Sequence, residues 1–160
     1  MLFATHLAAA VLVARVSRLP MPWLVGGAAF PDVLDKPLGT LGVFELYHSI
    51  GHSVFLALVL IPLALYARVW LAFAIGWASH ILLDTVHVVV NGRPGHALAF
   101  LWPLVESADP LGIPPGEFFW HYLGTPSFYL EIVLWAVLLC VLVVQRREGS
   151  DRLRTDFGDT

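Results

Sequence analysis

The sequence predicts an all-α protein: a polytopic membrane helical bundle with four to five transmembrane segments, some of them short or re-entrant. Three observations predict this fold class. The composition is 58% hydrophobic and only 13% charged, which is about half the usual charged fraction. The mean hydropathy is +0.77, and 160 residues suffice for one domain. A soluble domain of this size would carry more charged surface, so a free cytosolic enzyme is disfavoured.

Five apolar stretches follow one another along the chain. They cover residues 2–16, 21–30, 53–67, 69–90 and 128–144. Only the last two approach the ~20 residues that span a bilayer core, and 21–30 is short enough for a half-helix or a re-entrant segment. A cleaved signal peptide is an alternative for the first stretch, but that stretch lacks a basic start. We therefore expect a membrane-embedded helical domain with the metal-site motifs over 1–144 and a polar, solvated cytoplasmic tail over 145–160.

The positions of the arginines predict an orientation. Arginines follow the first stretch, separate the third from the fourth and close the fifth: Arg15, Arg18, Arg68, Arg146 and Arg147. If the segments cross alternately, these arginines share one side, which the positive-inside rule makes cytoplasmic. The protein would then be an integral protein of the cell (inner) membrane with its N-terminus outside. Lys36 and Arg93 are exceptions on the outer side, where all seven histidines would also lie.

Charge and cysteine content exclude some classes of function. The formal net charge is −3, and no Lys/Arg cluster precedes the tail, so nucleic-acid binding is disfavoured. The single Cys140 provides neither a disulfide framework nor a thiolate metal site. Membrane lipids are the expected partners, and the histidines and aspartates are the remaining chemical signal.

The strongest motif is GWASHILLDTVH, from Gly76 to His87. His80 and Asp84 are four residues apart, so they project from one face of a helix, one turn apart. An ionised Asp near the membrane end of an apolar helix is costly, by ~2.5 kcal/mol or more at the bilayer centre, so it needs a partner. A divalent ion would satisfy both side chains, and mixed imidazole and carboxylate ligands suit zinc. An Asp–His hydrogen bond between helices is the alternative.

Two other segments carry the same ligand types. YHSIGHS spaces His48 and His52 by four residues, so one helical turn would offer two imidazoles to metal ions. Polar residues at a helix start would explain this pair as well. FPDVLDKP spaces Asp32 and Asp35 by three, and its two prolines predict a stiff turn at the end of an apolar segment. Two carboxylates there suit a two-metal hydrolytic site, although Asp beside Pro is also common in surface turns.

A fourth element is His6, which lies in the otherwise apolar stretch THLAAAVLVA. A lone His there can also serve as an interhelical hydrogen-bond donor. Because four elements converge on one predicted membrane face, we expect a shared metal site. Its candidate ligands are His6, Asp32, Asp35, His48, His52, His80 and Asp84.

These motifs resemble those of the YdjM-like family of predicted inner-membrane metal-dependent hydrolases, over residues 2 to about 105. That family pairs an early His with a Pro-Asp-x-Asp turn, a His-rich segment ending in His-Ser, and a Gly-aromatic-x-Ser-His-x-x-x-Asp helix followed by an apolar Trp-Pro or Pro-Phe stretch. The matching positions are His6, Pro31-Asp32, His48 with His52-Ser53, Gly76 to His80 with Asp84, and Trp102-Pro103. Members are also distantly similar to zinc-dependent phospholipase C, whose helical bundle binds several zinc ions.

The residues and the resemblance together imply a membrane-bound metal-dependent hydrolase with one to three divalent ions, zinc first. A bound ion lowers the pKa of water to ~7 and so supplies hydroxide, with Asp32 or Asp35 as the catalytic proton acceptor. The location favours a phosphoester or a lipid-like or lipid-linked ester as substrate. A metal-ion transporter or a non-catalytic metal-binding membrane protein is the first alternative. A haem-binding bundle is the second, although a carboxylate one turn from His80 argues against haem.

Overall fold

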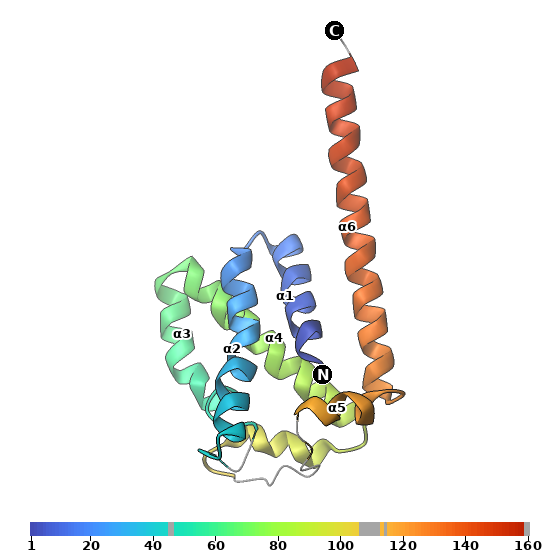
Figure 1. Cartoon of the computed structure of the whole chain (residues 1–160). Helices are drawn as coiled ribbons and strands as arrows, with labels where there is room; N and C mark the ends of the chain where they lie inside the picture. Colours follow the sequence, from blue (N-terminus) through green and yellow to red (C-terminus); the bar gives the residue numbers. More distant parts are fainter. Residues whose placement is uncertain (45–46, 106–112, 114, 159–160) are drawn as a thin grey trace.

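The computed structural model describes residues 1–44, 47–105, 113 and 115–158, and it describes the side chains of these residues except 115 and 149–158. Every regular element in this part of the chain is helical, which confirms the predicted all-α class. The helices are α1 (Phe3–Ser17), α2 (Met21–Thr40), η1 (Val54–Leu56), α3 (Ala57–Tyr66), α4 (Arg68–Val90), η2 (Pro94–Leu101), α5 (Pro115–Tyr122) and α6 (Pro126–Gly158) (Figure 1).

The long helices alternate in direction along the chain (Figure 1). The start of α1, the segment that follows α2 and the end of α4 lie at one end of the molecule, together with η2 and α5. The α1–α2 and α3–α4 connections lie at the opposite end, and α6 extends beyond them. By length and composition, α4 and the part of α6 from Pro126 to Glu148 can cross a membrane. The shorter apolar helices are Phe3–Ser17 and Val54–Tyr66.

Two glycines allow α2 and α4 to pack backbone against backbone. A Cβ atom on Gly27 would lie 2.0 Å from the carbonyl oxygen of Phe73, and one on Gly76 would lie 2.0 Å from that of Leu24. Neither position has room for a side chain, so both helices depend on glycine at their crossing. Small residues at helix interfaces permit this close approach in membrane proteins. The contact sets the distance between the polar residues that follow on α2 and α4.

The predicted turn at FPDVLDKP is wrong, because α2 continues through Pro31 and Pro37 to Thr40. A proline inside a helix removes one backbone hydrogen bond and bends the helix, but packing can outweigh this loss. Here Pro31 is buried against the backbone of Gly51. Asp32 and Asp35 therefore lie one turn apart on a helix and share a face.

The polar residues after 144 also form helix, since α6 ends only at Gly158. The sequence predicts a solvated extension there. Between Gln145 and Phe157 the chain has one glycine and no proline, so few residues oppose continuation of the preceding apolar helix. Its position in the cytoplasm stays a prediction.

Candidate metal centre

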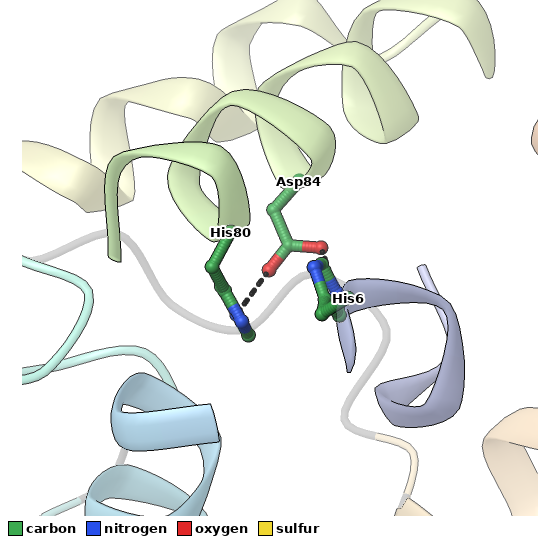
Figure 2. A group of neighbouring side chains, drawn as sticks. All are labelled: His6, His80 and Asp84. Atoms are coloured by element: carbon green, nitrogen blue, oxygen red, sulfur yellow. Dashed lines mark ion pairs between the residues drawn. The ribbon is translucent and has the colours of Figure 1, made fainter. Parts of the chain in front are cut away.

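The core of the cluster comes from the second half of α4. His80 and Asp84 are both buried, and His80 Nε2 lies 3.2 Å from Asp84 Oδ2 (Figure 2). The other ring nitrogen of His80, Nδ1, lies 2.7 Å from the carbonyl oxygen of Ala28 on α2. A carbonyl only accepts hydrogen bonds, so Nδ1 donates. In the neutral ring, Nε2 is then a free acceptor that faces the carboxylate.

His6 on α1 approaches the same carboxylate from the other side. Its Nε2 atom lies 3.2 Å from Asp84 Oδ1, and its ring stacks on that of His80 with the centroids 3.7 Å apart. Figure 2 shows Asp84 reaching toward His80 with one oxygen and toward His6 with the other. The amino group of Met1 also donates to Asp84 Oδ1, over 2.8 Å. His6, the single histidine of the apolar helix α1, therefore lies in the cluster of candidate ligands, as the sequence predicts.

The segment after α2 brings in His52, which is fully buried. Its backbone is held against α2 by the carboxylate of Asp35, which accepts from the N–H groups of Ser49 (2.8 Å), Gly51 (2.9 Å) and His52 (3.1 Å). Asp35 Oδ2 also lies 2.7 Å from His52 Nδ1. Burial opposes the charge on Asp35, but the hydrogen bonds from His52 and from the backbone lower its pKa overall. Asp35 therefore fixes the ring of His52, as carboxylates do behind metal-binding histidines.

Asp32 lies between the histidines His52 and His80 on one side and Lys36 on the other. Its Oδ1 atom is 3.6 Å from His52 Nε2 and 3.8 Å from His80 Nε2. Its Oδ2 atom accepts a hydrogen bond of 2.7 Å from Lys36 Nζ, one helical turn along α2. From the sequence Lys36 is only an exception to the positive-inside rule, although its spacing of four from Asp32 indicates an ion pair on one helix face.

His48 lies at the edge of the cluster and is half-buried. Its ring centroid is 4.5 Å from that of His52. Burial first, and then the neighbouring charge of His52, together lower the pKa of His48 to about 3. His48 is therefore neutral at ordinary pH, which is the form of imidazole that binds metal ions.

Among the residues that the structure describes, three overlapping sets of side chains could each hold a metal ion, because one ligand atom from each member lies within 4.8 Å of the others. The sets are His6–His80–Asp84, Asp32–His52–His80 and His48–His52–Asp84. Six of the seven predicted ligands belong to them. Asp35 belongs to none, because its oxygens face the segment that carries His52.

Ion pairs within the protein offer another account of the same cluster. Burial opposes a charge on His52, but Asp32 and Asp35 raise its pKa overall. A proton on His52 Nε2 would then satisfy Asp32 without a metal ion. The geometry of the cluster therefore suits either internal ion pairs or a bound metal ion.

The remaining histidines lie outside the three sets. His87 is buried and contacts Ser127 on α6, with His87 Nδ1 and Ser127 Oγ 2.9 Å apart. His121 on α5 is exposed, and His96 is half-buried. Trp102, from the motif Trp-Pro, accepts a hydrogen bond of 2.6 Å from Ser53 Oγ through its carbonyl oxygen. This bond ties the segment after η2 to the residue that follows His52.

Over the described part of the chain, the fold and the cluster define a helical protein with two helices that are long and apolar enough to cross a membrane and with buried His/Asp groups able to hold a metal ion. No protein-family model, no curated protein and no solved structure matches this chain. The resemblance to the YdjM-like family therefore stays a prediction from the motifs, and function must be inferred from the cluster itself.

Proposed function

We propose that the protein is a membrane-bound metal-dependent hydrolase of the YdjM-like type that cleaves a phosphoester or a lipid-like ester. One to three divalent ions would bind, and zinc is the ion that we expect. The ligands would come from the six clustered residues: His6, Asp32, His48, His52, His80 and Asp84. Imidazole nitrogen and carboxylate oxygen together are the ligand set that zinc and related ions prefer.

One observation carries the proposal: His52 Nε2 and His80 Nε2 lie 3.1 Å apart. Each ring donates from its other nitrogen, His52 to Asp35 and His80 to Ala28 O. In the neutral rings, two acceptor lone pairs then face one another, beside Asp32 Oδ1 and Asp84 Oδ2. A cation between the two ring nitrogens removes this repulsion. Two buried acceptors that face one another with no hydrogen atom between them favour metal binding.

The chain's own residues then divide the remaining work. A bound divalent ion supplies hydroxide at neutral pH by lowering the pKa of water to ~7. Asp32 is better placed than Asp35 to take up a proton, because Oδ1 of Asp32 faces His52 and His80 whereas both oxygens of Asp35 accept from the 49–52 backbone. Asp35 positions His52 in this scheme. Asp84 would act as a ligand on both sides, because one of its oxygens faces His6 and the other faces His80.

The arrangement of the helices supports four to five spans with the site toward the outer face. The cluster residues come from the start of α1, from α2 and the segment after it, and from the second half of α4; in Figure 1 the start of α1, the segment after α2 and the end of α4 lie away from the α1–α2 and α3–α4 connections. Arg15, Arg18 and Arg68 belong to those connections or lie beside them. The positive-inside rule assigns that end to the cytoplasm.

The test begins with elemental analysis of protein purified without chelators. Wild type should carry a stoichiometric transition metal, and His80→Ala and Asp84→Ala should lose most of it. His121→Ala is the matched control, since His121 is exposed and outside the three sets. A metal-free wild type, or full occupancy in both site variants, would exclude the metal centre.

Hydrolysis is tested next with bis(p-nitrophenyl) phosphate and a p-nitrophenyl acyl ester. Chelator treatment should abolish turnover, and zinc should restore it in wild type and in His121→Ala but not in His80→Ala. The alternative function is metal transport or metal binding without catalysis. The deep burial of His52 and His80, both 0% exposed, is the observation that favours it. Zinc uptake into proteoliposomes with no ester cleavage by the same preparation would support that alternative.

A further inference from the structure

Lys36 is the only lysine in the chain, and it contacts the cluster through Asp32. Its ammonium group donates to Asp32 Oδ2, and its side chain is 34% exposed. An ammonium group has three N–H donors. The bond to Asp32 uses one of them, so the others remain for a ligand that comes from the open side.

A shallow, open groove with an almost entirely apolar lining runs along α2 beside this lysine. Its volume is about 580 Å³. Its lining residues are Phe3, Asp32, Val33, Lys36, Pro37, Thr40 and Leu41. Val33 and Leu41 are 62% and 77% exposed, so the groove presents apolar side chains to its surroundings. Lys36 is the one cation among these lining residues.

We propose that this groove binds a lipid phosphoester, with Lys36 contacting the phosphate and Val33, Leu41 and Phe3 contacting the apolar chain. This inference rests on the proposed hydrolase function, whose substrate it narrows. The juxtaposition carries it: Asp32 turns one oxygen to the histidine pair and the other to Lys36. A phosphate held by Lys36 is therefore next to the candidate metal ligands while its chain lies along α2.

The charge and the polarity of the groove together select this occupant. An anion is needed to match the ammonium group of the partly exposed Lys36 side chain, and phosphate accepts charge-assisted hydrogen bonds readily. An apolar chain is needed to cover the exposed lining, because a free phosphate or a short phosphoester would leave it in contact with water. A lipid phosphate has both parts, and an uncharged lipid lacks the first.

The experiment measures binding of a fluorescent phosphatidic acid to the full-length protein in neutral nanodiscs. The same labelled diacylglycerol lacks the phosphate, and glycerol phosphate, used as a competitor, lacks the chains. Lys36→Met should weaken phosphatidic acid binding by about tenfold or more, which is the usual effect of losing a charged hydrogen bond. Lys36→Arg should keep most of the affinity. Arg15→Met is the control, because Arg15 is an exposed charge at the end of α1 that lies away from the groove residue Phe3.

Leu41→Asn tests the apolar part, and it should weaken phosphatidic acid binding by about threefold to tenfold without changing competition by glycerol phosphate. Equal affinity of wild type and Lys36→Met overturns the proposal, as does diacylglycerol binding as tightly as phosphatidic acid. Glycerol phosphate competing as well as the lipid would show an anion site only, and would also overturn it.

Measuring the metal content distinguishes a failure of the lipid-binding proposal from a failure of the hydrolase proposal. Lys36→Met should keep the wild-type metal content and the wild-type melting temperature; loss of metal together with the lipid would show that Lys36 only supports Asp32, which overturns a direct contact. If wild type holds no metal but binds phosphatidic acid through Lys36, the hydrolase proposal fails and the lipid site stands.

Discussion

Asp35 Oδ2 lies 2.7 Å from His52 Nδ1, and the same carboxylate accepts the backbone N–H groups of Ser49 and Gly51. One buried side chain of α2 thus fixes both the ring of His52 and the course of the backbone that carries it. The opposite ring nitrogen, Nε2, is left to face the cluster. A residue with no direct place among the candidate ligands therefore governs how one ligand is aimed.

Asp35→Asn should weaken metal binding without removing the site. The amide replaces one carboxylate oxygen with an NH2 group, which opposes the backbone N–H donors, and it leaves one uncharged oxygen as a weaker acceptor for the ring of His52. Loss of such a supporting group usually costs ~10–100-fold in metal affinity. Competition with a zinc chelator measures it. Ser49→Ala is the control, because it keeps the backbone N–H and removes a buried hydroxyl that has no partner among the described residues. Equal zinc affinity in Asp35→Asn and wild type would contradict this role.

Substitutions at the neighbouring glycines Gly26 and Gly27 distinguish the effect of helix packing on stability from the effect of helix propensity. Gly27→Ala would put a methyl group 2.0 Å from the Phe73 carbonyl oxygen, whereas Gly26 has nothing within 4 Å of the same added atom. We expect Gly27→Ala to destabilise the protein by about 1–3 kcal/mol and to reduce metal content, because His80 Nδ1 bonds Ala28 O across this contact.

Gly26→Ala should be neutral or up to ~1 kcal/mol stabilising, since alanine favours helix over glycine. Thermal unfolding in detergent, followed by circular dichroism, measures both variants. Similar unfolding temperatures for the two variants would show that α2 and α4 do not pack as closely as the glycines indicate.

The helical class followed from the sequence because apolar stretches and their lengths record it directly. Residues 2–16, 53–67 and 69–90 agree with α1, with η1 and α3 together, and with α4. The course of α2 did not follow, because Pro31 and Pro37 are usual helix breakers and only the tertiary contact at Gly51 shows why the helix continues. The helical end of α6 was missed for a related reason: its polar composition masked the absence of proline.

The candidate ligands were predictable as residue types, since His and Asp at helical spacing within apolar segments need partners. Their roles were not. Asp32 and Asp35 look equivalent in FPDVLDKP, and only the backbone after α2 distinguishes them, because it bonds to Asp35. Lys36 was read as an exception to a charge rule, and its position beside Asp32 shows its local purpose.

The contact between α4 and α6 should be independent of the metal centre. Ser127 Oγ bonds His87 Nδ1 (2.9 Å) and accepts from Asn91 Nδ2 (2.8 Å). Ser127→Ala should therefore lower stability by about 1–2 kcal/mol and leave metal content unchanged. Thr85→Ala is the control, because that hydroxyl bonds Ile81 O within α4. Thermal unfolding and elemental analysis on one preparation decide this; loss of metal would mean that His87 and the cluster are coupled.

Orientation is testable because Cys140 is the only cysteine. In a Cys140→Ser background, single cysteines replace Leu41 and Tyr66, which are 77% and 85% exposed. Leu41 follows α2 and Tyr66 ends α3, and these two helix ends lie at opposite ends of the bundle (Figure 1). A membrane-impermeant maleimide added to intact cells should label Leu41→Cys, since the positive-inside rule places that end outside. Tyr66→Cys should be labelled only after permeabilisation. The reverse pattern would put the cluster and its groove on the cytoplasmic side, and labelling of both in intact cells would mean that α3 does not cross.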